Sequence, residues 1–193
     1  MESKVKFAGH AVHQMLIVFP LGLLATAVIF DIIYLLSDHA QWTVAAYYMI
    51  GAGIIGGLAA AATGWLDWFA IPQGTRAKRI GLWHGAGNVV VLGLFIVSWA
   101  LRRDNPELPA TGAIVAAIGG VVVALGTAWL GGELVDRLGV GVDDGAHLDS
   151  PSSLSKLPAA SNQGAGRSSA AGYGGPERRA SANSAYGQVN RTV

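Results

Sequence analysis

The chain has 193 residues, of which 52% are hydrophobic and only 13% are charged. Its formal net charge of +1 argues against a protein that binds nucleic acid through a concentrated basic face. The absence of cysteine excludes disulfides, thiolate chemistry and cysteine-ligated metals. Soluble domains normally carry about a quarter charged residues. The low charge and the mean hydropathy of +0.43 therefore indicate a protein whose outer surface faces lipid.

Four apolar runs follow one another along the chain, at about residues 11–36, 44–71, 80–101 and 111–135. A helix needs about 20 apolar residues to cross the roughly 30 Å hydrocarbon core of a bilayer, and each run is long enough. The chain lacks the amphipathic helices that would form the outer layer of a soluble bundle. We therefore expect an all-α fold, a four-transmembrane-helix up-down bundle over residues 11–137, preceded by a cytoplasmic amino terminus over residues 1–10.

The composition changes after the fourth run. From residue 159 to the end, the only aliphatic side chains larger than alanine are Val189 and Val193. Such a segment cannot bury enough apolar surface to offset the entropy lost on ordering. We expect residues 138–193 to form a disordered cytoplasmic tail.

Basic residues are distributed unevenly between the two ends of the expected bundle. One side holds Lys4, Lys6, Arg76, Lys78, Arg79 and Arg137. The opposite side holds only Arg102 and Arg103, which the pattern assigns to an outer loop beside Asp104 and Glu107. Because basic residues favour the cytoplasmic side, we expect a multi-pass protein of the bacterial inner membrane with both termini in the cytoplasm.

Small residues recur at four-residue spacing in two of the runs. The second run contains Gly56, Ala60 and Gly64, and the fourth contains Ala116, Gly120, Ala124, Ala128 and Gly132. Small side chains let helices approach closely in lipid. We expect these stripes to pack the bundle, and any stripe left outside to support a homo-oligomer. Pro20 is expected to kink the first helix.

Polar residues within the apolar runs are costly in lipid and are therefore candidate functional residues. His13, Asp67, His84, Asn88 and Glu133 all lie near the cytoplasmic ends of their runs, because alternate spans run in opposite directions. Asp31 is the exception and lies near the outer end.

Two cofactors fit the residues on the cytoplasmic side. Imidazole and carboxylate are suitable ligands for a divalent metal, so His13, Asp67, His84 and Glu133 form one candidate metal site. Alternatively, His13 and His84 are candidate axial ligands of a haem b iron, because the first and third spans are parallel and therefore diagonal in the bundle; Met15 is a further candidate ligand. Either cofactor implies a redox membrane protein with a membrane redox partner.

Other interpretations of the same residues remain open. The histidines can be half-solvated interfacial residues, and Asp67 or Glu133 can pair with basic residues of the neighbouring connections. A proton or ion relay is another alternative, although the first span offers only Thr26 between Asp31 and the cytoplasmic side. The competing function is a non-catalytic membrane scaffold that recruits partners through its small-residue stripes and tail.

Four motifs in this order resemble a bacterial family of four-span integral membrane proteins catalogued as a domain of unknown function. They are His13-Gln-Met-Leu-Ile-Val-Phe-Pro, Leu66-Asp67-Trp68, His84-Gly-Ala-Gly-Asn88 and Gly131-Gly-Glu133, and the likeness covers about residues 10–142. The resemblance implies an integral membrane protein and supplies no activity.

This chain departs from the family pattern at the first motif. Many relatives carry His-Pro there and a second histidine just before Phe-Pro, whereas this chain has Gln14 and Val18. The resemblance is therefore compatible with a single site using His13 and His84 and argues against two haems. The layout also resembles that of membrane b-type cytochromes, an analogy at the level of the fold.

Overall fold

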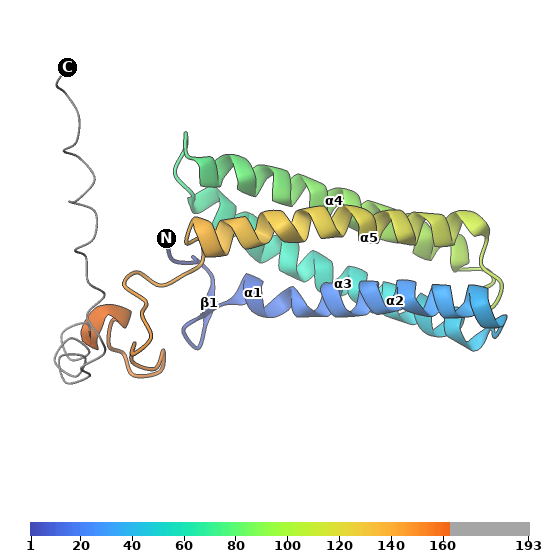
Figure 1. Ribbon diagram of the computed structural model, residues 1–193, viewed down its shortest axis with the longest axis horizontal. Coiled ribbons are helices and arrows are strands. Elements are labelled where there is room, and N and C mark those ends of the chain that lie inside the picture. The colour runs from blue at the N-terminus through green and yellow to red at the C-terminus, as the bar shows by residue number, and fades with distance from the viewer. Residues whose placement is uncertain (163–193) are drawn as a thin grey trace, which may run out of the picture.

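The computed structural model describes residues 1–162, which form four long helices packed side by side (Figure 1). The helical segments are α1 (Val12–Leu16), α2 (Val18–Ser37), α3 (Gln41–Ala70), α4 (Arg76–Arg102) and α5 (Thr111–Gly132), followed by the π-helical turn η1 (Glu133–Arg137). Segments α1 and α2 together make the first span, and α5 with η1 makes the fourth. All four spans are long and apolar enough to cross a membrane, which confirms the expected all-α bundle.

The helices are arranged as an up-down bundle. Each long helix contacts the next one along the chain, and α5 returns to contact α2. The first and third spans therefore lie on a diagonal, as expected. The amino terminus and the chain that follows η1 emerge at the same end of the bundle (Figure 1).

The bundle core is made of small and aliphatic side chains that fit around one aromatic ring. Ala27, Ala46, Ile50, Phe95 and Ala117 have no exposed surface. The Phe95 ring lies against Gly120, where an added Cβ would be only 2.7 Å from Phe95 Cε2. Gly53 accepts Leu24 in the same way. Small residues of α3 and α5 thus pack the bundle internally, while large apolar side chains on the outside of every helix face lipid.

The first span is interrupted at Ile17, between α1 and α2. Pro20 has no backbone N–H, so it cannot donate the helical hydrogen bond to the Leu16 carbonyl, which marks the end of α1. The expected irregularity in the first span therefore occurs one turn before the proline itself. His13 lies on α1, before the break.

Two reciprocal contacts close the connection between α3 and α4. Trp68 Nε1 donates to the Lys78 carbonyl oxygen over 3.0 Å, and Lys78 Nζ donates to the Trp68 carbonyl oxygen over 2.7 Å. The Lys78 ammonium also lies 3.9 Å from the centre of the Trp68 ring. Lys78 is buried, because its charge is satisfied by the carbonyl end of α3 and by the aromatic face.

A short hairpin precedes the first span. Strands β1 (Lys6–Phe7) and β2 (His10–Ala11) are antiparallel and are joined by Ala8-Gly9. Both turn residues have positive φ, 50° and 82°. Two successive positive φ angles are typical of the turn whose twist matches a two-residue hairpin.

The chain that follows η1 folds back onto this hairpin. Gly141 N donates to the Met1 carbonyl oxygen over 2.9 Å. Lys6 Nζ donates to Glu2 over 2.8 Å and to Asp143 over 2.5 Å. Residues 138–162 contain turns and a short 3-10 helix, η2 (Ala159–Asn162). The remainder of the expected tail, residues 163–193, lies outside the described residues.

Candidate functional site

The bundle brings His13 and His84 together near the end that carries the amino terminus, which we call the histidine end. His13 lies on α1 and His84 on the diagonal helix α4. Their ring centroids are 6.5 Å apart, and the ring planes are nearly perpendicular at 89°. Both side chains are half-buried. The structure thus pairs the two histidines that the sequence singled out.

Each histidine is held by a backbone carbonyl of a neighbouring helix. His13 Nδ1 lies 2.8 Å from the Ala60 oxygen, and His84 Nδ1 lies 2.8 Å from the Thr127 oxygen. A carbonyl oxygen can only accept a hydrogen bond, so Nδ1 carries the hydrogen in both rings. In the neutral rings the lone pair is then on Nε2, the tautomer in which an imidazole binds a metal through Nε2.

A polar network fixes the orientation of His84. Asn88 Nδ2 donates to the His84 carbonyl oxygen over 3.0 Å and lies 3.2 Å from His84 Nε2. Thr127 Oγ1 donates to Asn88 Oδ1 over 3.0 Å. Asn88 and Thr127 therefore position the ring from α4 and α5 together. The sequence pointed to Asn88 through its four-residue spacing from His84, but it gave no reason to select Thr127.

Glycines provide the space that the two rings occupy. A Cβ at Gly64 on α3 would lie 2.8 Å from His13 Cε1, and one at Gly131 on α5 would lie 3.1 Å from His84 Cε1. Each imidazole thus lies directly against the backbone of an adjacent helix. The expected packing stripe of α3 consequently has a second role at Gly64, where it fixes a polar side chain.

Asp67 is buried near the end of α3, but its carboxylate is occupied by the amino-terminal segment. Ser3 Oγ lies 2.9 Å and 2.7 Å from the two carboxylate oxygens, and Lys4 N donates to Oδ1 over 2.6 Å. These hydrogen bonds satisfy the oxygens of the buried carboxylate. Asp67 therefore attaches residues 3–4 to the end of the bundle.

Glu133 pairs with Arg76 over 2.6 Å rather than with a histidine, which is the ion-pair alternative considered from the sequence. Among residues 1–162, no group of three or more His, Asp or Glu side chains is arranged to hold a metal ion. Met15 lies on the exposed surface of α1. Of the four expected metal ligands, the structure therefore brings His13 and His84 together and directs Asp67 and Glu133 to other partners.

The opposite end of the bundle, which we call the ion-pair end, contains a salt bridge that the sequence analysis missed. Arg102 Nη1 and Nη2 donate to the two oxygens of Asp31, each over 2.6 Å. Both side chains have no exposed surface. The assignment of Arg102 to an outer loop is therefore wrong, because Arg102 is the last residue of α4 and its side chain extends back into the bundle to neutralise Asp31.

Further hydrogen bonds complete this buried pair. Arg102 Nε donates to Ser98 Oγ over 3.3 Å, and Ser98 Oγ donates to the Ala113 carbonyl oxygen over 2.7 Å. The sequence could have predicted this pair from the position of Asp31 along its span. A carboxylate inside a span requires a cation at the same depth in the membrane, and only Arg102 and Arg103 are available on that side. Asp31 is thus fully satisfied.

Comparison with known proteins supports the membrane assignment. A family model described as "Predicted membrane protein (DUF2231)" matches residues 9–144. The matched range includes His13, Asp67, His84 and Glu133 as well as all four spans. No curated protein and no solved structure matches the chain.

Proposed function

The chain belongs to the DUF2231 family of predicted membrane proteins, and from that premise we propose that it binds one b-type haem between His13 and His84 and carries single electrons in the bacterial inner membrane. The observation that carries this proposal is the pair of perpendicular, half-buried imidazoles on diagonal helices. When bound, the haem iron supplies the one-electron chemistry, and the protein supplies ligation, orientation and a low-dielectric environment.

The closeness of the two rings supports the proposal that both imidazoles would hold one haem iron. The centroids of His13 and His84 are 6.5 Å apart. The backbone hydrogen bonds at Nδ1 leave both Nε2 lone pairs as the ligating atoms.

The number of available ligands favours haem over a bare metal ion. A divalent metal usually takes four or more protein ligands or waters. A porphyrin supplies four nitrogens itself, so two histidines complete the coordination of the iron. Because Asp67 and Glu133 are occupied by Ser3 and Arg76, a two-histidine site fits haem better.

The residues around the histidines would orient and support the ligands. Asn88 would keep its bond to the His84 carbonyl oxygen and give up the longer 3.2 Å contact to Nε2. Gly64 and Gly131 would keep each ring against a helix backbone, which limits rotation of the imidazoles. Ala60 and Thr127 would increase the basicity of the ligands by accepting from Nδ1.

We propose that the histidine end faces the cytoplasm and meets a membrane redox partner there. Lys4, Lys6, Arg76 and Arg79 all belong to this end, and an excess of basic residues marks the cytoplasmic side. A reporter enzyme fused to the carboxyl terminus tests this orientation. Activity of a cytoplasmic reporter is expected, and activity of a periplasmic reporter would overturn it.

Absorption spectroscopy of protein purified in detergent from haem-replete cells tests the cofactor. We expect a Soret band with one haem per chain, and loss of this band in His13→Ala and in His84→Ala. His39→Ala is the matched control, because His39 is exposed in the connection before α3 and should leave the spectrum unchanged. Metal analysis of the same samples measures iron and any other bound ion.

The His84→Met variant separates loss of a ligand from loss of the fold. Methionine can ligate haem iron and would raise the reduction potential, so this variant should retain haem with an altered spectrum and potential. Wild-type protein without a Soret band and without stoichiometric metal would refute the proposal and leave the scaffold as the function to test. Retention of the full spectrum in both alanine variants would refute these ligands.

A further inference from the structure

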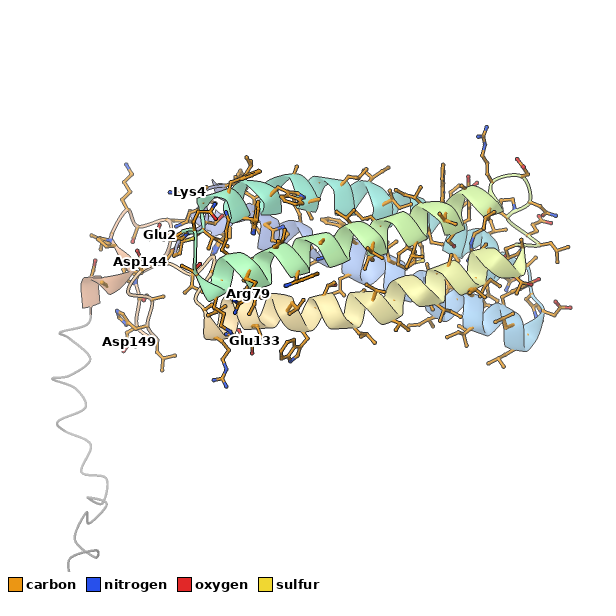
Figure 2. The ribbon with its side chains drawn as sticks, turned by 90° about the horizontal axis from the view of Figure 1, so that it is seen from above. Glu2, Lys4, Arg79, Glu133, Asp144 and Asp149 are labelled. Atoms are coloured by element: carbon orange, nitrogen blue, oxygen red, sulfur yellow. The ribbon has the colours of Figure 1, made fainter. Side chains whose placement is uncertain are left out.

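A second polar site lies at the lipid-facing surface of the histidine end. A hollow of about 230 Å³ is lined by Trp129 and Gly132 from α5 and by Glu133, Asp136 and Arg137 from η1. Figure 2 shows Glu133 at this end of the bundle, near the start of α4 and Arg79. The hollow is formed by different residues from those that hold His13 and His84.

Local backbone structure forms the hollow. The last turn of the fourth span is π-helical, over Glu133–Arg137. Such wider turns are rare and occur frequently at functional sites, because they redirect side chains out of the regular helical pattern. Here the turn presents an acid and a base, Asp136 and Arg137, next to each other at the end of a membrane span. Both side chains are exposed.

The hollow is lined by side chains of both charge signs, and only one of them has an ion-pair partner among residues 1–162. Glu133 is neutralised by Arg76. Asp136 and Arg137 form no ion pair with any of residues 1–162. Within residues 1–162, the Asp136 carboxylate and the Arg137 guanidinium thus have no salt-bridge partner, and both line the hollow. This arrangement is complementary to a ligand that carries an ammonium and a phosphate group.

The hollow is continuous with a lipid-facing stripe of α5. Val122, Leu125 and Trp129 are 64%, 69% and 65% exposed, and their spacing of three and four residues puts them on one face of the helix. Trp129 lies between this apolar stripe and the charged turn, a position in which tryptophan is enriched at membrane interfaces. Acyl chains beside the stripe would bring a headgroup to the level of η1.

We propose that this hollow binds the headgroup of an aminophospholipid such as phosphatidylethanolamine, with its ammonium on Asp136 and its phosphate on Arg137. The carboxylate can accept hydrogen bonds from a primary ammonium, which a quaternary choline cannot donate. A purely anionic headgroup fits less well, because it offers no cation to the Asp136 carboxylate, which lines the hollow beside Arg137. The site is independent of haem.

Native mass spectrometry of the full chain, released from bilayers of equal parts phosphatidylethanolamine, phosphatidylcholine and phosphatidylglycerol, tests the proposal. Wild-type protein should retain phosphatidylethanolamine over each competitor by about fivefold, the ratio that corresponds to an exposed ion pair of about 1 kcal/mol. The double variant Asp136→Asn with Arg137→Gln should lose this preference. The single variant Asp136→Asn should no longer distinguish ethanolamine from choline, while its total bound lipid stays the same.

The opposite end of the molecule provides a matched control. Arg103 and Asp104 are also an adjacent, exposed base and acid, so Arg103→Gln with Asp104→Asn makes the same chemical change away from the hollow. This control should keep the wild-type lipid preference. Equal retention of all three lipids by wild-type protein, preferential retention of phosphatidylglycerol, or equal losses in both double variants would overturn the proposal.

Discussion

The two ends of the bundle both place polar side chains inside the membrane-spanning helices, but they satisfy them differently. At the ion-pair end, Asp31 and Arg102 have no exposed surface and use both oxygens and all three guanidinium nitrogens in hydrogen bonds. At the histidine end, His13 and His84 are half-buried, and backbone carbonyls use only one nitrogen of each ring. Polar residues in a span can therefore stabilise the fold or remain available for chemistry.

The Asp31–Arg102 pair differs from the two histidines because all of its polar side-chain atoms form hydrogen bonds. A buried charge without a partner is very costly in a low-dielectric environment, so a fully bonded pair persists because removing either member is worse. His13 is held in place without using all of its hydrogen-bonding capacity, since its Nε2 forms no hydrogen bond within residues 1–162, whereas His84 Nε2 has the 3.2 Å contact with Asn88. This contrast is the reason for assigning function to the histidine end.

Breaking the ion pair should have the largest effect on stability. Arg102→Met leaves Asp31 buried and unpaired, and we expect the free energy of unfolding to fall by about 3–5 kcal/mol. Thermal or denaturant unfolding in a defined detergent measures this change. Arg103→Met is the control, because Arg103 is exposed and should leave stability within about 0.5 kcal/mol of wild type.

Replacing both members of the pair should restore most of this loss. The double variant Asp31→Leu with Arg102→Met removes both charges and substitutes apolar side chains of similar size, so it should be much more stable than Arg102→Met alone. A double variant as unstable as the single one would show that the pair contributes more than mutual neutralisation.

Filling the space beside His13 should have a smaller effect on stability and a larger one on the candidate site. In Gly64→Ala the new methyl group would lie 2.8 Å from His13 Cε1, so the ring must move. We expect a loss of about 1–3 kcal/mol, and the proposed haem site predicts a changed absorption spectrum as well. Gly93→Ala is the matched control, since a Cβ there meets open space; a comparable spectral change in that variant would contradict the assignment.

Removing the hydroxyl that orients Asn88 should cost less. Thr127→Val keeps the shape of the side chain but deletes the 3.0 Å bond to Asn88 Oδ1, and we expect a loss of about 1 kcal/mol in unfolding experiments. Thr63→Val deletes a hydroxyl that bonds only the carbonyl of its own helix turn, at Ala60, and should change stability less. Equal losses would show that the Asn88 network adds nothing.

The smallest effect concerns the exposed charges that cover the histidine end. Lys6 lowers the pKa of Glu2 below its ordinary 4.5, mainly by hydrogen bonding, and Asp143 and then Glu2 raise the pKa of Lys6 above 10.5. The contribution of Glu2 is present above pH 4.5 and is lost as pH falls through its lowered pKa. The contribution of Lys6 is present below pH 10.5 and is lost as pH rises through its raised pKa. The contacts should therefore persist throughout the neutral range.

An NMR titration of the Glu2 carboxyl group checks this prediction. In Lys6→Met the pKa of Glu2 should return toward 4.5. Lys4→Met removes a neighbouring exposed charge that forms no ion pair within the described part of the chain, so it should leave the pKa of Glu2 near its wild-type value. Identical shifts in the two variants would indicate a general charge effect instead of the specific contact.

Much of the architecture follows directly from the sequence. Run length and the absence of charge within the runs predicted four spans, because the bilayer thickness sets the length of a spanning helix. The meeting of His13 and His84 was also predictable, since the first and third spans are parallel and both residues lie near the same membrane surface. These predictions depend only on how deep each residue lies in the membrane. A helix has a fixed rise per residue, so the residue number determines that depth.

Rotation and side-chain reach were harder to predict. Arg102 was assigned to a loop because it follows the last apolar residue of its run, but a long side chain can extend one turn or more back into the bundle. Asp67 was expected to face the histidines, yet residues 3–4 reach its carboxylate first. Such contacts depend on chain segments with no periodic pattern, so the sequence alone could not assign them.

The contacts between Trp68 and Lys78 have a consequence for how the protein enters the membrane. They join residues only ten positions apart, so the turn can close before either helix meets α2 or α5. Local contacts of this kind form early, because little chain entropy is lost in making them. Helices α3 and α4 can therefore insert together as a hairpin with the lysine ammonium already hydrogen-bonded at its base.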